Sequence, residues 1–124
     1  INMSLGTLKD SPFSESEDLI LRSAIEDAFN SGVLVVVAAG NETADIGEYS
    51  VSPAYYSSSF TVSSVGNDGV ISSFSNYGDN IAAAAFGGEY NDYGSVDGTG
   101  VLSTYIGNDY GWSIGTSMAA PLSG

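Results

Sequence analysis

The sequence predicts an α/β protein in three layers, with a mainly parallel sheet flanked by helices. Helical and strand-like patterns alternate along its 124 residues, and this alternation is typical of that architecture. An apolar stripe from Leu21 to Phe29 recurs at helical spacing and indicates an amphipathic helix. The apolar run from Val33 to Ala39 shows no polar alternation, which is typical of a parallel strand buried on both faces.

The first elements predict a strand–helix–strand unit. Residues 1–5 have the pattern of a short apolar strand. Ser14 and Glu17 have the spacing of a capping box at the start of the helix, and residues 30–32 supply its carboxyl-terminal cap. The run from Val33 to Ala39 then completes a right-handed βαβ unit.

Shorter elements are expected in the second half of the chain. Residues 60–65 and 81–85 each have the pattern of a strand, and the small side chains of the second allow close approach of a backbone or helix. Residues 101–106 and 110–114 flank a Gly-Asn-Asp turn and predict a β-hairpin. The last helix is expected to begin at Ser117.

The composition excludes several classes of function. Two basic and 15 acidic side chains give a net charge of −13, so neither nucleic acid nor an anionic membrane surface is expected as a partner. The chain has no Cys, which excludes disulfides, thiolate metal sites and a Cys nucleophile. It also has no His, which removes the commonest general base and the commonest zinc ligand. With 43 % apolar residues, it is too hydrophobic for a disordered acidic tail.

Two polar residues lie where an open α/β sheet binds ligands. Asn41 directly follows the buried run, and its amide group could donate a hydrogen bond to a developing oxyanion. The alternative is an Asn that only occupies a left-handed turn after Gly40. Ser117 lies at a strand-to-helix turn, where a helix N-terminus favours negative charge, and the alternative there is a capping serine.

Four short motifs bear on these alternatives. Residues 115–121 (GTSMAAP) resemble the nucleophile segment of the subtilisin-like serine proteases (subtilases, peptidase family S8). Residues 38–41 resemble the family's oxyanion-hole segment, and residues 2–6 resemble its substrate-pairing strand. Residues 73–78, followed by 85–87, resemble the stretch between those segments. The motifs follow the family's order over nearly the whole chain, so the sequence resembles the C-terminal half of a subtilase catalytic domain.

The resemblance implies a serine endopeptidase that acts through a Ser-His-Asp triad. Ser117 would be the nucleophile, and the Asn41 amide together with the Ser117 N–H would form the oxyanion hole. Two further groups are implied: Ser4, Leu5 and Gly6 would pair with the substrate backbone, and Ala38, Ala39 and Gly40 would form a wall of the pocket for the residue before the cleaved bond. Such small walls imply tolerance of large apolar side chains, and Glu42 near the rim would add acceptance of Lys or Arg.

The chain departs from the family pattern in ways that limit this expectation. The family's Asp and His precede the segment that begins at Ile1, and the chain contains no His, so Ser117 is expected to be inactive in this chain alone. After Pro121 the family continues with a His and a long buried helix, whereas this sequence ends at Gly124.

Two places in the sequence bear on a possible metal site. Many family members hold a cation near the positions of Asn80 and Ala82, but Ala82 has no ligand atom. An acidic loop could bind Ca²⁺ through Glu89, Asp92 and Asp97, although its spacing matches no EF-hand and a solvated loop is the alternative. No metal site or cofactor is therefore assigned, and calcium is left open for the full-length protein.

We expect residues 1–124 to be an incomplete part of the catalytic domain of a secreted, extracellular protease. The expected partners are a polypeptide substrate and either the remainder of the catalytic domain or further copies of the chain. The alternative is a non-catalytic acidic binding module derived from a subtilase. Labelling of the full-length protein by a fluorophosphonate separates the two, because only the protease has an activated serine.

Overall fold

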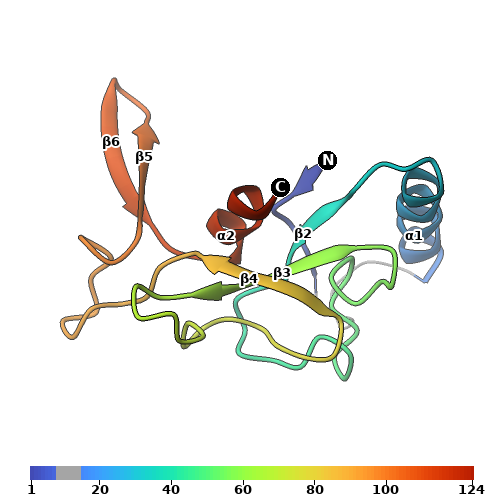
Figure 1. Cartoon of the computed structure of the whole chain (residues 1–124), viewed down its shortest axis with the longest axis horizontal. Coiled ribbons are helices and arrows are strands. Elements are labelled where there is room, and N and C mark those ends of the chain that lie inside the picture. The colour runs from blue at the N-terminus through green and yellow to red at the C-terminus, as the bar shows by residue number, and fades with distance from the viewer. Residues whose placement is uncertain (8–14) are drawn as a thin grey trace.

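The computed structural model describes residues 1–7 and 15–124, and its centre is a parallel sheet (Figure 1). The four strands are β1 (Asn2–Met3), β2 (Val36–Ala38), β3 (Phe60–Val65) and β4 (Ile81–Phe86). They lie side by side in the order β1-β2-β3-β4, and each neighbouring pair is parallel. The predicted α/β architecture is confirmed.

Two helices flank the sheet, and residues of β2 alternate between them. On one face, Val37 packs in a cluster with Ile25 of helix α1 (Glu15–Asn30). On the other face, Val36 and Ala38 pack with Ala119 and Ala120 of helix α2 (Thr116–Ser123). Successive side chains of a strand point to opposite faces, so β2 contributes to both cores. Its burial on both faces is as predicted.

Helix α1 ends where its sequence predicts. The Gly32 N–H donates to Phe29 O at 2.9 Å and the Val33 N–H donates to Ala28 O at 2.9 Å, which satisfies the last carbonyl groups of the helix. Gly32 has a φ of +78°, a conformation that glycine adopts without steric cost. Ser14 of the expected capping box lies outside the described residues.

The second strand is shorter than the apolar run that predicts it. Val33 and Leu34 are 39 % and 49 % exposed, and β2 begins only at Val36. The reason is non-local: Val36 is the first residue with partners on both sides, Asn2 in β1 and Phe60 in β3. The expected strand over residues 33–39 is therefore wrong at its beginning.

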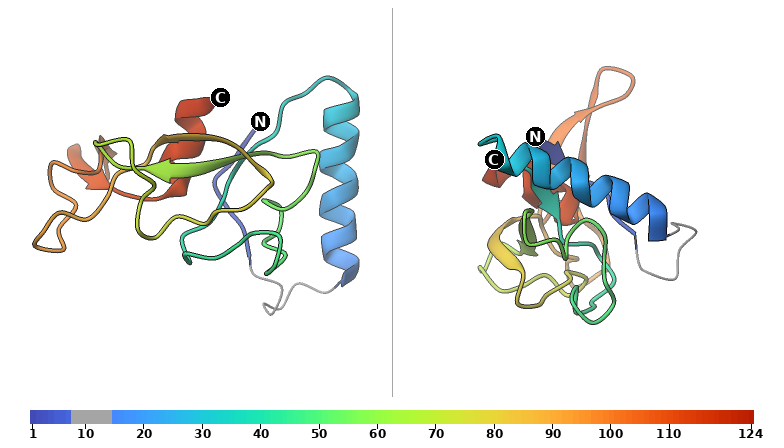
Figure 2. Two further views of the ribbon diagram at one scale, coloured as in Figure 1. Left: turned by 60° about the horizontal axis from the view of Figure 1, so that its bottom comes forward. Right: turned by 90° about the vertical axis from the view of Figure 1, so that its right-hand side faces the viewer.

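Strands β5 (Val101–Tyr105) and β6 (Asp109–Ser113) form the expected antiparallel hairpin. The hairpin stands away from the rest of the molecule and lies at the opposite end from α1 (Figures 1 and 2). Its second strand leads into α2, so the hairpin and the N-terminus of that helix are directly connected. No helix in the described ranges is long and apolar enough to cross a membrane.

Candidate active site

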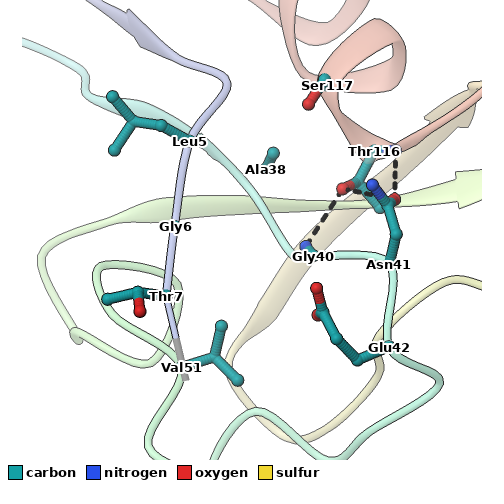
Figure 3. Close-up of a pocket in the computed structure, with 10 residues that line it drawn as sticks. All are labelled: Leu5, Gly6, Thr7, Ala38, Gly40, Asn41, Glu42, Val51, Thr116 and Ser117. Carbon is teal, nitrogen blue, oxygen red and sulfur yellow. Dashed lines mark hydrogen bonds between the residues drawn. The ribbon is translucent and has the colours of Figure 1, made fainter. Parts of the chain in front are cut away.

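A pocket of about 190 Å³ lies beside the N-terminus of α2, where the chain leaves β1 and β2 (Figure 3). Ten residues line it: Leu5, Gly6, Thr7, Ala38, Gly40, Asn41, Glu42, Val51, Thr116 and Ser117. Small-molecule sites usually have roughly 300–1,000 Å³. The pocket is smaller than that, and its size suits one amino-acid side chain.

Ser117 is the second residue of α2 and is half-buried at the edge of this pocket. Its hydroxyl lies 3.5 Å from Ser4 O, and the Ser4 hydroxyl donates to Ser117 O at 2.8 Å. The first N–H groups of a helix have no intrahelical acceptor. Within the described part of the chain, the Ser117 N–H donates to no other group either. That N–H is consequently available to a ligand.

The side chain of Asn41 is oriented by Thr116. Asn41 Oδ1 accepts from the Thr116 N–H at 2.9 Å and from the Thr116 hydroxyl at 3.1 Å. The same hydroxyl accepts from the Gly40 N–H at 3.0 Å, and Figure 3 shows these bonds as dashed lines. Because Oδ1 faces a backbone donor, the orientation of the amide is determined. Asn41 Nδ2 has no partner among residues 1–7 and 15–124.

The geometry thus brings two unused N–H donors to one pocket. Asn41 and Thr116 are 75 residues apart in the sequence, and the bonds between them join the two segments that carry these donors. The Gly115 N–H also donates to Gly87 O at 2.9 Å, which ties the turn before α2 to the end of β4. A group that develops negative charge beside Ser117 would find these donors already in place.

Most of the predicted site residues lie at this pocket. Those that line it are Leu5, Gly6, Ala38, Gly40, Asn41 and Ser117. Ser4 lies next to them through its bond to Ser117. Ala39 is fully buried and is not part of the lining. Its N–H donates to Val62 O, and its carbonyl oxygen accepts from Asn76 Nδ2.

Thr116 and Val51 line the pocket, although the sequence alone gives neither of them a role there. Thr116 stands inside the motif of residues 115–121, but its bonds to Gly40 and Asn41 span a sequence distance that no local pattern shows. Val51 is buried in a loop and has no sequence signal that points to the pocket. Glu42, expected near the rim, lines the pocket.

The acidic side chains of the described residues do not gather into a metal site. No group of three or more His, Cys, Asp or Glu residues that could hold a metal ion occurs in the described ranges. Burial would raise the pKa of Glu89, but bonds from the Ser73 and Tyr90 N–H groups and from the Ser73 hydroxyl outweigh this and lower it. Calcium binding by the full-length protein stays a prediction.

Comparison with known proteins places the chain in a family. The model of the subtilase family matches residues 1–123. The minor extracellular protease Epr of Bacillus subtilis is 36 % identical over 98 % of this chain, which covers 16 % of that protein. The thermostable alkaline protease of Halalkalibacterium halodurans is 40 % identical over 98 % of this chain, which covers 28 % of that protein.

Solved structures agree with the sequence relatives. A protease of Pseudoalteromonas arctica matches 98 % of this chain with a TM-score of 0.80 and 39 % identity, over 35 % of its own chain. A cold-adapted subtilisin-like serine proteinase matches 97 % with a TM-score of 0.72 and 35 % identity, over 36 % of its own chain. The chain therefore spans only part of the length of its relatives. Since the family model matches almost all of it, the chain belongs to the subtilase family of serine proteases.

Proposed function

We propose that this chain supplies the nucleophile and the oxyanion hole of a serine endopeptidase, and that the remainder of the catalytic domain supplies the His and the Asp. The observation that supports it best is the pair of unused donors, the Ser117 N–H and Asn41 Nδ2, which lie at one pocket beside the Ser117 hydroxyl. The names of the relatives, which are proteases, support the same reaction class.

The proposed reaction follows from these groups. The His takes the proton of the Ser117 hydroxyl while Ser117 Oγ attacks the scissile carbonyl carbon, whose oxygen becomes an oxyanion. The Ser117 N–H and Asn41 Nδ2 donate to that oxygen and lower the energy of the transition state. The His then gives its proton to the leaving amine as the peptide bond breaks. Water hydrolyses the resulting acyl ester and restores the serine.

The pocket supports a proposal for the substrate. Leu5 and Gly6 line its edge just after β1, where a substrate backbone would pair in an extended conformation. Ala38, Gly40 and Val51 supply small or apolar walls for a large apolar side chain. Glu42 adds a carboxylate that attracts Lys or Arg. The extracellular relative in Bacillus subtilis supports secretion of the full-length protein.

Labelling of the full-length protein by a fluorophosphonate tests the proposal. We expect the label on Ser117, and Ser117→Ala should remove it and lower kcat by about 10⁶, the magnitude known for subtilisin, itself a subtilase. Asn41→Leu should lower kcat by about 10² to 10³, the magnitude that removal of one such donor has in subtilisin. A folded full-length protein without any label would instead support the non-catalytic module.

A second test measures peptide hydrolysis by the isolated 124-residue chain. We expect no release from a chromogenic peptide above background, because the chain has no His to act as general base. Turnover that Ser117→Ala abolishes would contradict the assignment of the general base to another part of the protein.

A further inference from the structure

The fully buried side chain of Asn76 lies against the segment that carries Asn41. Its Nδ2 donates to Ala39 O at 2.9 Å and to Glu42 Oε2 at 2.7 Å. Its Oδ1 accepts from the Glu42 and Ala44 N–H groups, each at 2.9 Å. Both hydrogens and both lone pairs of the amide are thus used. Two backbone donors face Oδ1, so the orientation of this amide is determined as well.

The backbone of the same segment is closed tightly onto Asn76. The Asn76 N–H donates to Gly40 O at 3.0 Å. A Cβ atom on Gly40 would lie 2.3 Å from Asn76 Nδ2 and 2.6 Å from Glu42 Oε2, and Gly40 has a φ of +103°. Only glycine fits such an approach. Asn76 therefore holds the chain on both sides of Asn41, at residues 39 and 40 and at residue 42.

Glu42 connects this interior contact with the pocket. One oxygen of its carboxylate is bonded to Asn76, and the residue itself is exposed and lines the pocket. Figure 3 shows the carboxylate beside Gly40. Glu42 Oε1 has no partner in the described part of the chain and is free to bind the cationic side chain of a substrate Lys or Arg. The bond to Asn76 thus selects one orientation of a side chain that would otherwise rotate in solvent.

We propose that Asn76 is a positioning residue of the peptidase site. Through the backbone of residues 39–42 it holds the oxyanion donor Asn41, and through Glu42 it sets the acceptance of Lys or Arg before the cleaved bond. The inference rests on the proposed function. Replacing a residue that only fills the interior would lower the stability of the protein and nothing else. Replacing Asn76 should also change kcat and the selectivity for the side chain before the cleaved bond.

A double-mutant cycle on the full-length protein tests this role. Asn76→Ser keeps a short polar group for the loop backbone but cannot reach the Glu42 carboxylate, and Glu42→Gln removes the charge. Selectivity is the ratio of kcat/KM for two peptides that differ only in Lys or Phe before the cleaved bond. In the unmutated background, Glu42→Gln should lower this ratio about two- to fivefold, as for a partly exposed ion pair. In the Asn76→Ser background the same change should have little effect.

A second readout separates positioning from packing. Asn76→Ser should lower kcat for the Phe peptide about tenfold with little change in KM, since the displaced donor acts on the transition state. The matched control is Asn91→Ser, which removes two side-chain bonds to the Tyr93 and Ser95 N–H groups in a loop outside the pocket. It should leave kcat and the ratio unchanged. Asn76→Ala is used if Asn76→Ser does not fold. For each variant, the fraction labelled by the fluorophosphonate gives the folded fraction, and kcat is calculated per labelled site.

The outcomes are distinct. Equal effects of Glu42→Gln in both backgrounds, or no effect in the unmutated one, overturn the role of Asn76 while labelling of Ser117 still supports the peptidase. Loss of stability without loss of kcat per labelled site overturns it too. A full-length protein that is folded but neither labelled nor affected by Ser117→Ala overturns the proposed function and this inference together.

Discussion

The hydroxyl group of Thr116 acts at the scale of a single residue. It is fully buried, accepts from the Gly40 N–H at 3.0 Å and donates to Asn41 Oδ1 at 3.1 Å. It thereby connects the segment after β2 with the first turn of α2. The Asn41 amide keeps a second bond, from the Thr116 N–H, which depends only on the backbone.

Thr116→Val keeps the size of the side chain and removes both hydroxyl bonds. In the full-length protein we expect a loss of about 1 kcal/mol in transition-state stabilisation, or about fivefold in kcat, with KM unchanged. Steady-state kinetics on one peptide measures it. Thr116→Ser retains the hydroxyl and should behave as the unmutated protein. A Ser variant as slow as the Val variant would show that the methyl group, and not the hydroxyl, matters.

The site residues differ in how far the sequence could predict them. Ser117 and Asn41 lie within short motifs, so their candidacy follows from a resemblance that local sequence carries. Asn76 lies in the motif of residues 73–78, but its side-chain partners are 32 to 37 residues away. Its role depends on how loops meet in space, and nothing in the neighbouring residues shows that.

At the scale of elements, a cluster around Asp18 fastens α1 to the loop before β3. The Asp18 carboxylate accepts from the hydroxyls of Ser52, Tyr55 and Tyr56, and Arg22 lies 3.4 Å from it. The Arg22 guanidinium also stacks 5.0 and 4.8 Å from the ring centroids of Tyr55 and Tyr56. The cluster joins residues more than 30 positions apart and holds the helix against this loop.

The cluster should make stability depend on pH. Burial alone would raise the pKa of Asp18, but bonds from Ser52, Tyr56 and Tyr55 and the charge of Arg22 outweigh it and lower the pKa. Asp18 therefore contributes to the free energy of unfolding at any pH above its pKa in the unfolded state, about 3.9. This contribution is lost as the pH falls through the lower pKa that Asp18 has in the folded state. Burial and the bond to Asp18 raise the pKa of Tyr56 to about 12, so its contribution is present below about pH 10 and lost toward pH 12.

Asp18→Asn tests this dependence. We expect it to lower the free energy of unfolding by about 1–3 kcal/mol at pH 7, because charged hydrogen bonds are lost. Below the folded pKa of Asp18 the difference should shrink, since the carboxyl group is then neutral in both states. Urea unfolding across the acid range measures both. Glu26→Gln, on an exposed position of the same helix, is the control. An equal loss at all pH values would contradict the assigned cause.

Elements with local boundaries were predicted well and elements with non-local boundaries less so. The end of α1 is set by Gly32, and the hairpin is set by its turn, where Gly107 and Asn108 have φ values of +84° and +60°. The start of β2 depends on where β1 and β3 offer partners. An apolar run indicates which residues are buried. Which of them form a strand depends on hydrogen-bonded pairing with the neighbouring strands, which the run itself does not show.

At the scale of the whole molecule, large apolar side chains remain exposed at both ends. On α1, Leu19, Ile20 and Phe29 are 63 %, 71 % and 55 % exposed. On the hairpin, Leu102, Ile106 and Tyr110 are 52 %, 86 % and 70 % exposed. Where exposed apolar side chains form a large contiguous patch, the patch marks a contact with other protein. We propose that they contact the remainder of the catalytic domain or, in the isolated chain, further copies.

Light scattering on the isolated chain tests the self-association. We expect association that strengthens with salt, because the net charge of −13 opposes it and salt screens that charge. Replacing Ile20 and Ile106 by Lys should weaken it. A monodisperse monomer at every salt concentration, with strongly protected amides in residues 35–39, would contradict it.

The unbonded Nδ2 of Asn41 has a consequence for how the protein is produced. Asn41, Glu42 and Thr43 form an Asn-x-Thr tripeptide, which is the acceptor for N-linked glycosylation. The sugar is attached to Nδ2, the atom proposed to donate to the oxyanion, on an exposed residue at the pocket. A eukaryotic secretory host would place a bulky oligosaccharide there, and the mass of the Asn41 peptide would report it. Bacterial production leaves the amide unmodified, so we expect protein from the two kinds of host to differ in how closely a bound group can approach Asn41 Nδ2.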